Sequence, residues 1–102
     1  LEMIRRGACG TISVASNIIP REISDMVRAA NAGDFAKAGE LDDRYARLVG
    51  DLMGMDTNPV PVKEAAALMG YCTGEIRLPL VPMVSEKVDT LKGLLKDYGL
   101  LG

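Results

Sequence analysis

Residues 7–14 read Gly-Ala-Cys-Gly-Thr-Ile-Ser-Val, and the second half of this stretch limits how the chain can fold. The run from Gly10 to Val14 is rich in β-branched, strand-forming residues, whereas the glycines before it disfavour a helix. A single strand cannot satisfy its own backbone N–H and C=O groups. We therefore predict a strand at residues 10–14 that pairs with a part of the protein outside this chain or with a second copy.

Four helices are predicted after the strand, so the isolated chain should be mostly α-helical. Pro20 suits the first turn of a helix, where an N–H has no partner, and Gly33 suits a helix end because glycine accepts positive φ. Asp34 is placed to cap the second helix, and Ser85 to cap the last. The predicted helices cover residues 20–32, 34–53, 61–69 and 85–98.

Two further features concern packing. Residues 77–82 read Arg-Leu-Pro-Leu-Val-Pro, which cannot be helical and is apolar, so we expect an extended connection packed over a core. Gly39 and Gly50 each weaken the second helix by about 1 kcal/mol relative to alanine. A close helix–helix contact would explain both glycines.

Composition excludes several classes of function. The net charge is −2, from 12 basic and 14 acidic residues, whereas nucleic-acid-binding domains carry clustered basic residues. No run approaches the roughly 18 apolar residues of a membrane span, and the first residues do not resemble a signal peptide, so we expect a cytoplasmic protein. Apolar residues make up 48 % of the chain, which suggests surface intended for a partner or for further parts of the same protein.

The sequence offers little catalytic chemistry. It has no histidine, which excludes a Ser-His or Cys-His nucleophile pair. Cys9 and Cys72 form neither a disulfide framework nor a metal-ligand spacing, and we expect both to be buried. Lys63 lies in an unusual setting just after two prolines, but a structural hydrogen bond or an exposed charge is favoured over a catalytic role.

Four stretches, in order and at suitable spacing, resemble the dihydrodipicolinate synthase family. Residues 7–17 are similar to the eighth strand of that family's barrel and the loop after it. Residues 32–38 resemble the junction between the last barrel helix and the tail, and residues 96–101 resemble the family's C-terminus. The most specific match joins Asn-Pro-Val-Pro-Val-Lys at residues 58–63 with the proline-rich run that begins at Arg77.

This resemblance implies the last part of a (β/α)₈ barrel followed by a three-helix C-terminal extension. Such barrels need about 250 residues, so the chain cannot contain a whole one. Residues 1–33 would be the end of helix seven, strand eight and helix eight of the barrel. Residues 34–102 would be a helical C-terminal domain.

The resemblance also implies a function for the parent protein. The family condenses pyruvate with aspartate semialdehyde through a lysine Schiff base, on the route to diaminopimelate and lysine. That lysine lies on strand six, so it and the proton-relaying residues fall outside this chain, which should be inactive alone and needs no cofactor. One binding position carries over: the main chain of Ile12 matches the residue of strand eight that lines the pyruvate pocket. The remaining partners would be the rest of the barrel or other copies in a homo-oligomer, with no nucleic acid and no membrane.

Two alternatives stay open. The chain could belong to another member of the same superfamily, such as an N-acetylneuraminate lyase or a keto-sugar-acid aldolase. The proline-rich stretches near Lys63 and Arg77 favour the synthase. A non-enzymatic helical interaction module is a different class of protein, and the strand at residues 10–14 opposes it.

Overall fold

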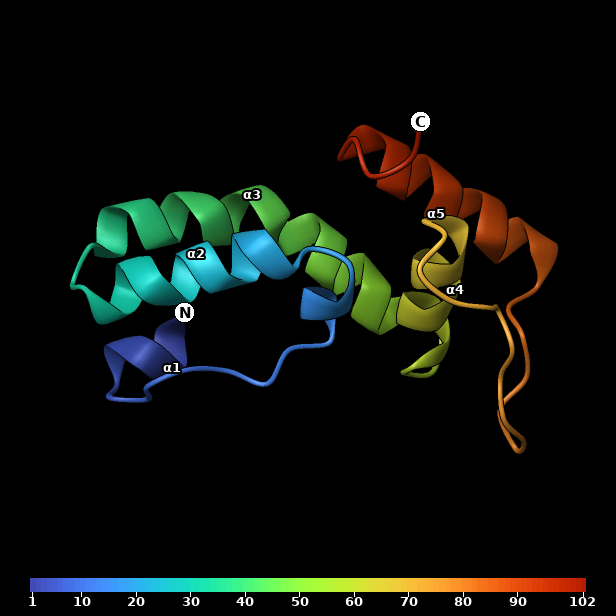
Figure 1. Ribbon diagram of the computed structural model, residues 1–102, viewed down its shortest axis with the longest axis horizontal. Coiled ribbons are helices and arrows are strands. Elements are labelled where there is room, and N and C mark those ends of the chain that lie inside the picture. Colours follow the sequence, from blue (N-terminus) through green and yellow to red (C-terminus); the bar gives the residue numbers. More distant parts are fainter. The chain divides into compact units, whose positions relative to one another are not determined.

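A computed structural model describes residues 1–102, and all of its regular structure is helical (Figure 1). The chain divides into two compact units, residues Leu1–Val49 and Gly50–Gly102. The four predicted long helices are confirmed to within one residue at each end. In chain order the elements are α1 (Glu2–Arg5), the 3-10 helix η1 (Ala15–Asn17), α2 (Pro20–Asn31), α3 (Phe35–Gly54), α4 (Val60–Leu68) and α5 (Ser85–Asp97).

The turn between α2 and α3 is built as the sequence predicts. Gly33 has a φ of 82°, and its N–H donates to the carbonyl of Ala30 at 3.0 Å while the N–H of Asp34 donates to Ala29 at 2.9 Å. These two bonds form a Schellman motif, which satisfies carbonyls at the end of α2. The carboxylate of Asp34 then accepts the N–H of Lys37 at 3.1 Å, which caps α3.

The core of the first unit joins α1, α2 and the first half of α3. Ile4, Met26, Ala30 and Ala38 are buried together, and partly buried side chains such as Leu41 pack against them. The tight turn at Gly33 reverses the chain, so α2 and the beginning of α3 lie side by side (Figure 1). This arrangement holds the start of the chain against α2.

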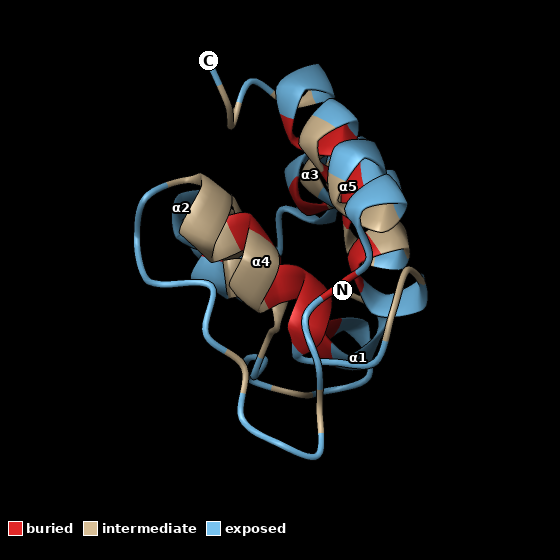
Figure 2. Cartoon of the chain, turned by 90° about the vertical axis from the view of Figure 1, so that its right-hand side faces the viewer, coloured by how far each residue is buried: buried red, intermediate tan, exposed pale blue.

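The second unit rests on the contact between α4 and α5. The first turn of α4 is buried, as Figure 2 shows in red, and Leu91, Leu94 and Leu95 supply the buried face of α5. An ion pair joins the segment before α4 to α5: Nζ of Lys87 lies 2.8 Å from a carboxylate oxygen of Asp56. The N–H of Thr57 also donates to Asp56 at 2.8 Å.

The predicted strand at residues 10–14 is absent. Residues 8–13 have no regular structure, and Val14 already has the helical backbone angles that lead into η1. Figure 1 shows an uncoiled stretch between α1 and η1. A lone strand has no ladder partner within this chain, so its β propensity cannot produce a sheet.

Several predictions about individual residues were wrong. Ser85 is the first residue of α5 and not its cap; Val84 takes the cap position without a side-chain hydrogen bond. A Cβ added to Gly39 or Gly50 would find no atom within 4 Å, so no close helix contact requires these glycines.

The connection at residues 77–82 is non-helical as predicted, but it does not pack over a core. Leu78 is 85 % exposed and Val81 is 63 % exposed. Only Met83, just after this run, is buried. The apolar character of the run is therefore not explained by contacts within the chain.

Candidate functional site

The segment between α1 and η1 is the candidate site, because it contains the one position predicted to bind substrate. The side chain of Ile12 is fully exposed, and Gly10 and Thr11 beside it are exposed as well. A broad hollow of about 460 Å³ borders these residues and reaches Ile23 and Met26 of α2. The segment thus forms one wall of an open depression.

One end of the segment is held by α2. The side-chain amide of Asn31, the last residue of α2, donates to the carbonyl of Cys9 at 2.9 Å. This bond spans 22 residues of sequence and ties the start of the segment to the end of the helix. No local pattern could have revealed Asn31, since the partner lies far away along the chain.

The other end is held by the first residues of η1. The hydroxyl of Ser16 donates to the carbonyl of Ser13 at 2.6 Å, and the N–H of Ser16 reaches the hydroxyl oxygen of Ser13 at 3.3 Å. The side-chain amide of Asn17 donates to the carbonyl of Val14 at 2.9 Å. The Ser-x-x-Ser spacing is a local signal for such a turn, and our sequence interpretation missed it.

Between these two ends the backbone is free. The main-chain N–H and C=O groups of Gly10, Thr11 and Ile12 make no hydrogen bond within the chain. Backbone polar groups in folded proteins are almost always paired once they are buried. These three residues can therefore accept a neighbouring strand, or a ligand with complementary polar groups.

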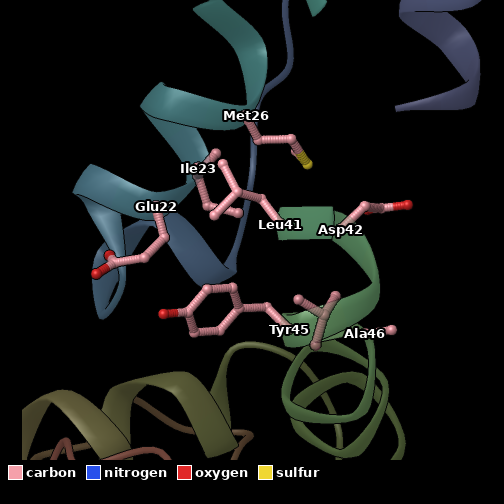
Figure 3. Close-up of a pocket in the computed structure, with 8 residues that line it drawn as sticks. Glu22, Ile23, Met26, Leu41, Asp42, Tyr45 and Ala46 are labelled. Atoms are coloured by element: carbon pink, nitrogen blue, oxygen red, sulfur yellow. The ribbon is translucent and has the colours of Figure 1, made fainter. Parts of the chain in front are cut away.

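A second depression lies between α2 and α3 and holds about 110 Å³ (Figure 3). Its floor is apolar, and Tyr45 lines one side. Glu22 and Asp42 lie at its edges, and Figure 3 shows their carboxylates directed away from each other. They cannot share a proton or a substrate atom, so this depression offers no acid–base pair.

The other residues singled out from the sequence lie in the second unit. Lys63 is partly buried in α4, and its main-chain carbonyl faces the thiol of Cys72 at 3.9 Å. Arg77 is exposed in the connection between α4 and α5. Neither residue belongs to a catalytic constellation within its unit.

No three His, Cys, Asp or Glu side chains gather as metal ligands. None of the helices has the length and apolar character needed to cross a membrane.

Both cysteines are exposed, which contradicts the prediction that they are buried. Cys9 lies in the segment between α1 and η1, and Cys72 follows the end of α4. The preference of cysteine for protein interiors depends on neighbours that cover it. In this chain neither segment is covered.

The chain is similar to known proteins in both sequence and structure. Residues 1–98 match the dihydrodipicolinate synthetase family. The 4-hydroxy-tetrahydrodipicolinate synthase of Persephonella marina is 48 % identical over 102 residues, which cover 99 % of this chain and 34 % of that protein. The crystal structure of dihydrodipicolinate synthase from Aquifex aeolicus superposes with a TM-score of 0.93 at 44 % identity, covering 98 % of this chain and 34 % of that one.

A second similar structure was solved with a ligand. The chloride-inhibited dihydrodipicolinate synthase from Acinetobacter baumannii, complexed with pyruvate, superposes with a TM-score of 0.91 at 38 % identity. Coverage is 98 % of this chain and 34 % of that one. The chain therefore spans about a third of the length of the relatives that it matches.

Proposed function

The chain belongs to the dihydrodipicolinate synthetase family, and on this premise we propose that it is part of a 4-hydroxy-tetrahydrodipicolinate synthase. The whole protein would be a lyase that condenses pyruvate with aspartate semialdehyde in the cytoplasm, on the route to diaminopimelate and lysine. The observation that carries this proposal is the match of the family over 98 of the 102 residues. Identities above 40 % to named synthases support the substrate assignment over the related sugar-acid lyases.

In the proposed reaction an enzyme lysine forms a Schiff base with pyruvate. The amine adds to the ketone carbon, a C=N bond replaces C=O, and the oxygen leaves as water. The imine then loses a proton from its methyl carbon to give an enamine. That carbon attacks the aldehyde carbon of the second substrate, and the aldehyde oxygen takes up a proton. No cofactor is required, because the protonated imine itself withdraws the electrons.

A Schiff-base lysine must lose its proton, usually through burial in a pocket. The lysines of this chain all lie on helices; in the second unit Lys87 is paired with Asp56, and Lys92 with Asp89. None of the five lysines is buried. We therefore assign the reactive lysine to the remaining two thirds of the protein and expect this chain alone to be inactive.

We assign residues 1–33 to the end of the barrel, with Gly10–Val14 as its eighth strand, and residues 34–102 to the helical C-terminal domain. The free backbone of residues 10–12 supports this assignment, because a barrel strand needs neighbours on both sides. Ile12 would lie near the carboxyl end of that strand, where barrel enzymes place their active sites. Its main chain would contact pyruvate, while its side chain packs within the barrel.

The exposed apolar side chains support further partners. Leu78, Val81 and Val84 are each at least 60 % exposed in the connection before α5. Exposed apolar residues in one short segment mark contact surfaces. We propose that the rest of the same protein and other copies in a homo-oligomer cover them.

Borohydride trapping tests the function. The whole protein, treated with pyruvate and then borohydride, should gain a stable adduct that peptide mapping places outside residues 1–102. The chain alone should keep its mass under the same treatment, and borohydride without pyruvate is the control for both. An adduct on any lysine of this chain would contradict the proposal.

A second experiment tests the substrate. Replacing aspartate semialdehyde by N-acetylmannosamine should abolish turnover of the whole protein, and the reverse preference would indicate an N-acetylneuraminate lyase.

A further inference from the structure

A pair of hydrogen bonds between Ser16 and Ser13 holds the end of the segment that joins α1 to η1. Its O–H···O distance of 2.6 Å lies at the short end for such bonds. The N–H of Ser16 returns to the side-chain oxygen of Ser13 at 3.3 Å, so the two residues are joined twice. Both residues are half-buried, which protects the bonds from competition by water.

This link determines which carbonyls of the segment remain available. The carbonyl of Ala15 accepts the N–H groups of Ile18 and Ile19, at 3.0 and 2.9 Å. That of Val14 accepts both the side chain and the N–H of Asn17, at 2.9 and 3.2 Å. Ser13 has no backbone partner for its carbonyl, and the hydroxyl of Ser16 takes that place.

Consequently Ile12 carries the first free carbonyl before the turn. Without the Ser16 hydroxyl, the carbonyl of Ser13 would also be free, and the peptide that follows Ser13 could rotate. That peptide meets the one carrying the Ile12 carbonyl at the Cα of Ser13. Only two soft dihedral angles link the two planes, so freeing one of them lets the Ile12 carbonyl reorient.

We propose that Ser16 is a positioning residue for pyruvate binding, acting through the main chain of Ile12. This inference rests on the proposed function and deepens it, because it names the side chain that orients the backbone contact. Ser16 does not touch the substrate itself. Its hydroxyl fixes the carbonyl of Ser13, and that bond holds the adjoining peptide of Ile12 in the direction that the ligand requires.

Kinetics of the whole synthase, with three substitutions, test the role of Ser16. Ser16→Ala removes the hydroxyl, and the KM for pyruvate should rise about fivefold, the effect of losing one hydrogen bond. The kcat and the KM for aspartate semialdehyde should stay within about twofold, since a backbone contact to pyruvate is the only one disturbed. Ser16→Thr keeps the donor and should restore the KM for pyruvate. Ser85→Ala, an exposed serine on α5, is the matched control and should change nothing.

Two results would overturn this role: a wild-type KM for pyruvate in Ser16→Ala, or an equal rise in Ser16→Thr. If Ser16→Ala does not fold, Ser16→Cys keeps the shape with a weaker donor. Its KM for pyruvate should then exceed that of Ser16→Thr, and equal values would refute the inference. A wild-type protein that forms no pyruvate adduct refutes the proposed function instead, so the two failures are distinguishable.

Discussion

Substituting alanine for Gly33 should destabilise the chain even though the new methyl group would touch nothing. A Cβ at this position finds no atom within 4 Å, so steric crowding contributes no cost. The φ of 82° does contribute, because residues with a Cβ lose about 1–2 kcal/mol in the left-handed region. The two hydrogen bonds of the turn, at 3.0 and 2.9 Å, prevent the backbone from relaxing away from this angle.

The same substitution at Gly39 provides a matched control of opposite sign. Gly39 lies within α3, and its added Cβ also meets no atom within 4 Å. Alanine there should stabilise the helix by about 1 kcal/mol. Urea unfolding followed by far-UV circular dichroism should therefore separate the two variants by about 2–3 kcal/mol. Gly33→Asn should lose less than Gly33→Ala, since asparagine tolerates positive φ. If Gly33→Ala were as stable as the wild type, the turn would not have the conformation described.

The remaining predictions concern charge and exposure. The hydrogen bond from Lys87, followed by that from the N–H of Thr57, holds the pKa of Asp56 below its ordinary value of 3.8. Because the folded pKa is the lower one, this stabilisation is present above pH 3.8 and is lost as the pH falls through the folded pKa. The urea midpoint should therefore fall less steeply between neutral and acidic pH in Asp56→Asn than in the wild type. An unchanged slope would count against the ion pair. Cys9 and Cys72 should both react with a thiol reagent in the native chain, and slow reaction of either would contradict its exposure.

The helix ends could be predicted because their causes are local. Gly33 and Asp34 act on groups within five residues, and the structure shows both in the expected roles. Ser85 shows the limit of this reasoning. A serine suits both the cap and the first helical position, and only the extended backbone of Val84 assigned the cap to the preceding residue.

Features that depend on distant neighbours were predicted less well. Strand propensity at residues 10–14 predicted a strand, but the chain offers no neighbouring strand and the segment is irregular. The burial expected for Cys9 fails for the same reason. Of the candidate site, Ile12 came from resemblance alone, and Asn31 was missed because its bond to Cys9 crosses 22 residues.

The segment around Ile12 is held by hydrogen bonds at both ends, whereas the backbone groups between the ends are unpaired. Ordering a backbone costs about 1–2 kcal/mol per residue, and Asn31 and Ser16 already hold its two ends. Between them, Gly10, Thr11 and Ile12 keep their polar groups unmatched. A backbone ordered in advance binds a strand or a ligand at a lower entropic cost. In the proposed synthase, a lysine elsewhere in the protein would perform the chemistry, and this chain would supply the main chain that holds pyruvate beside it.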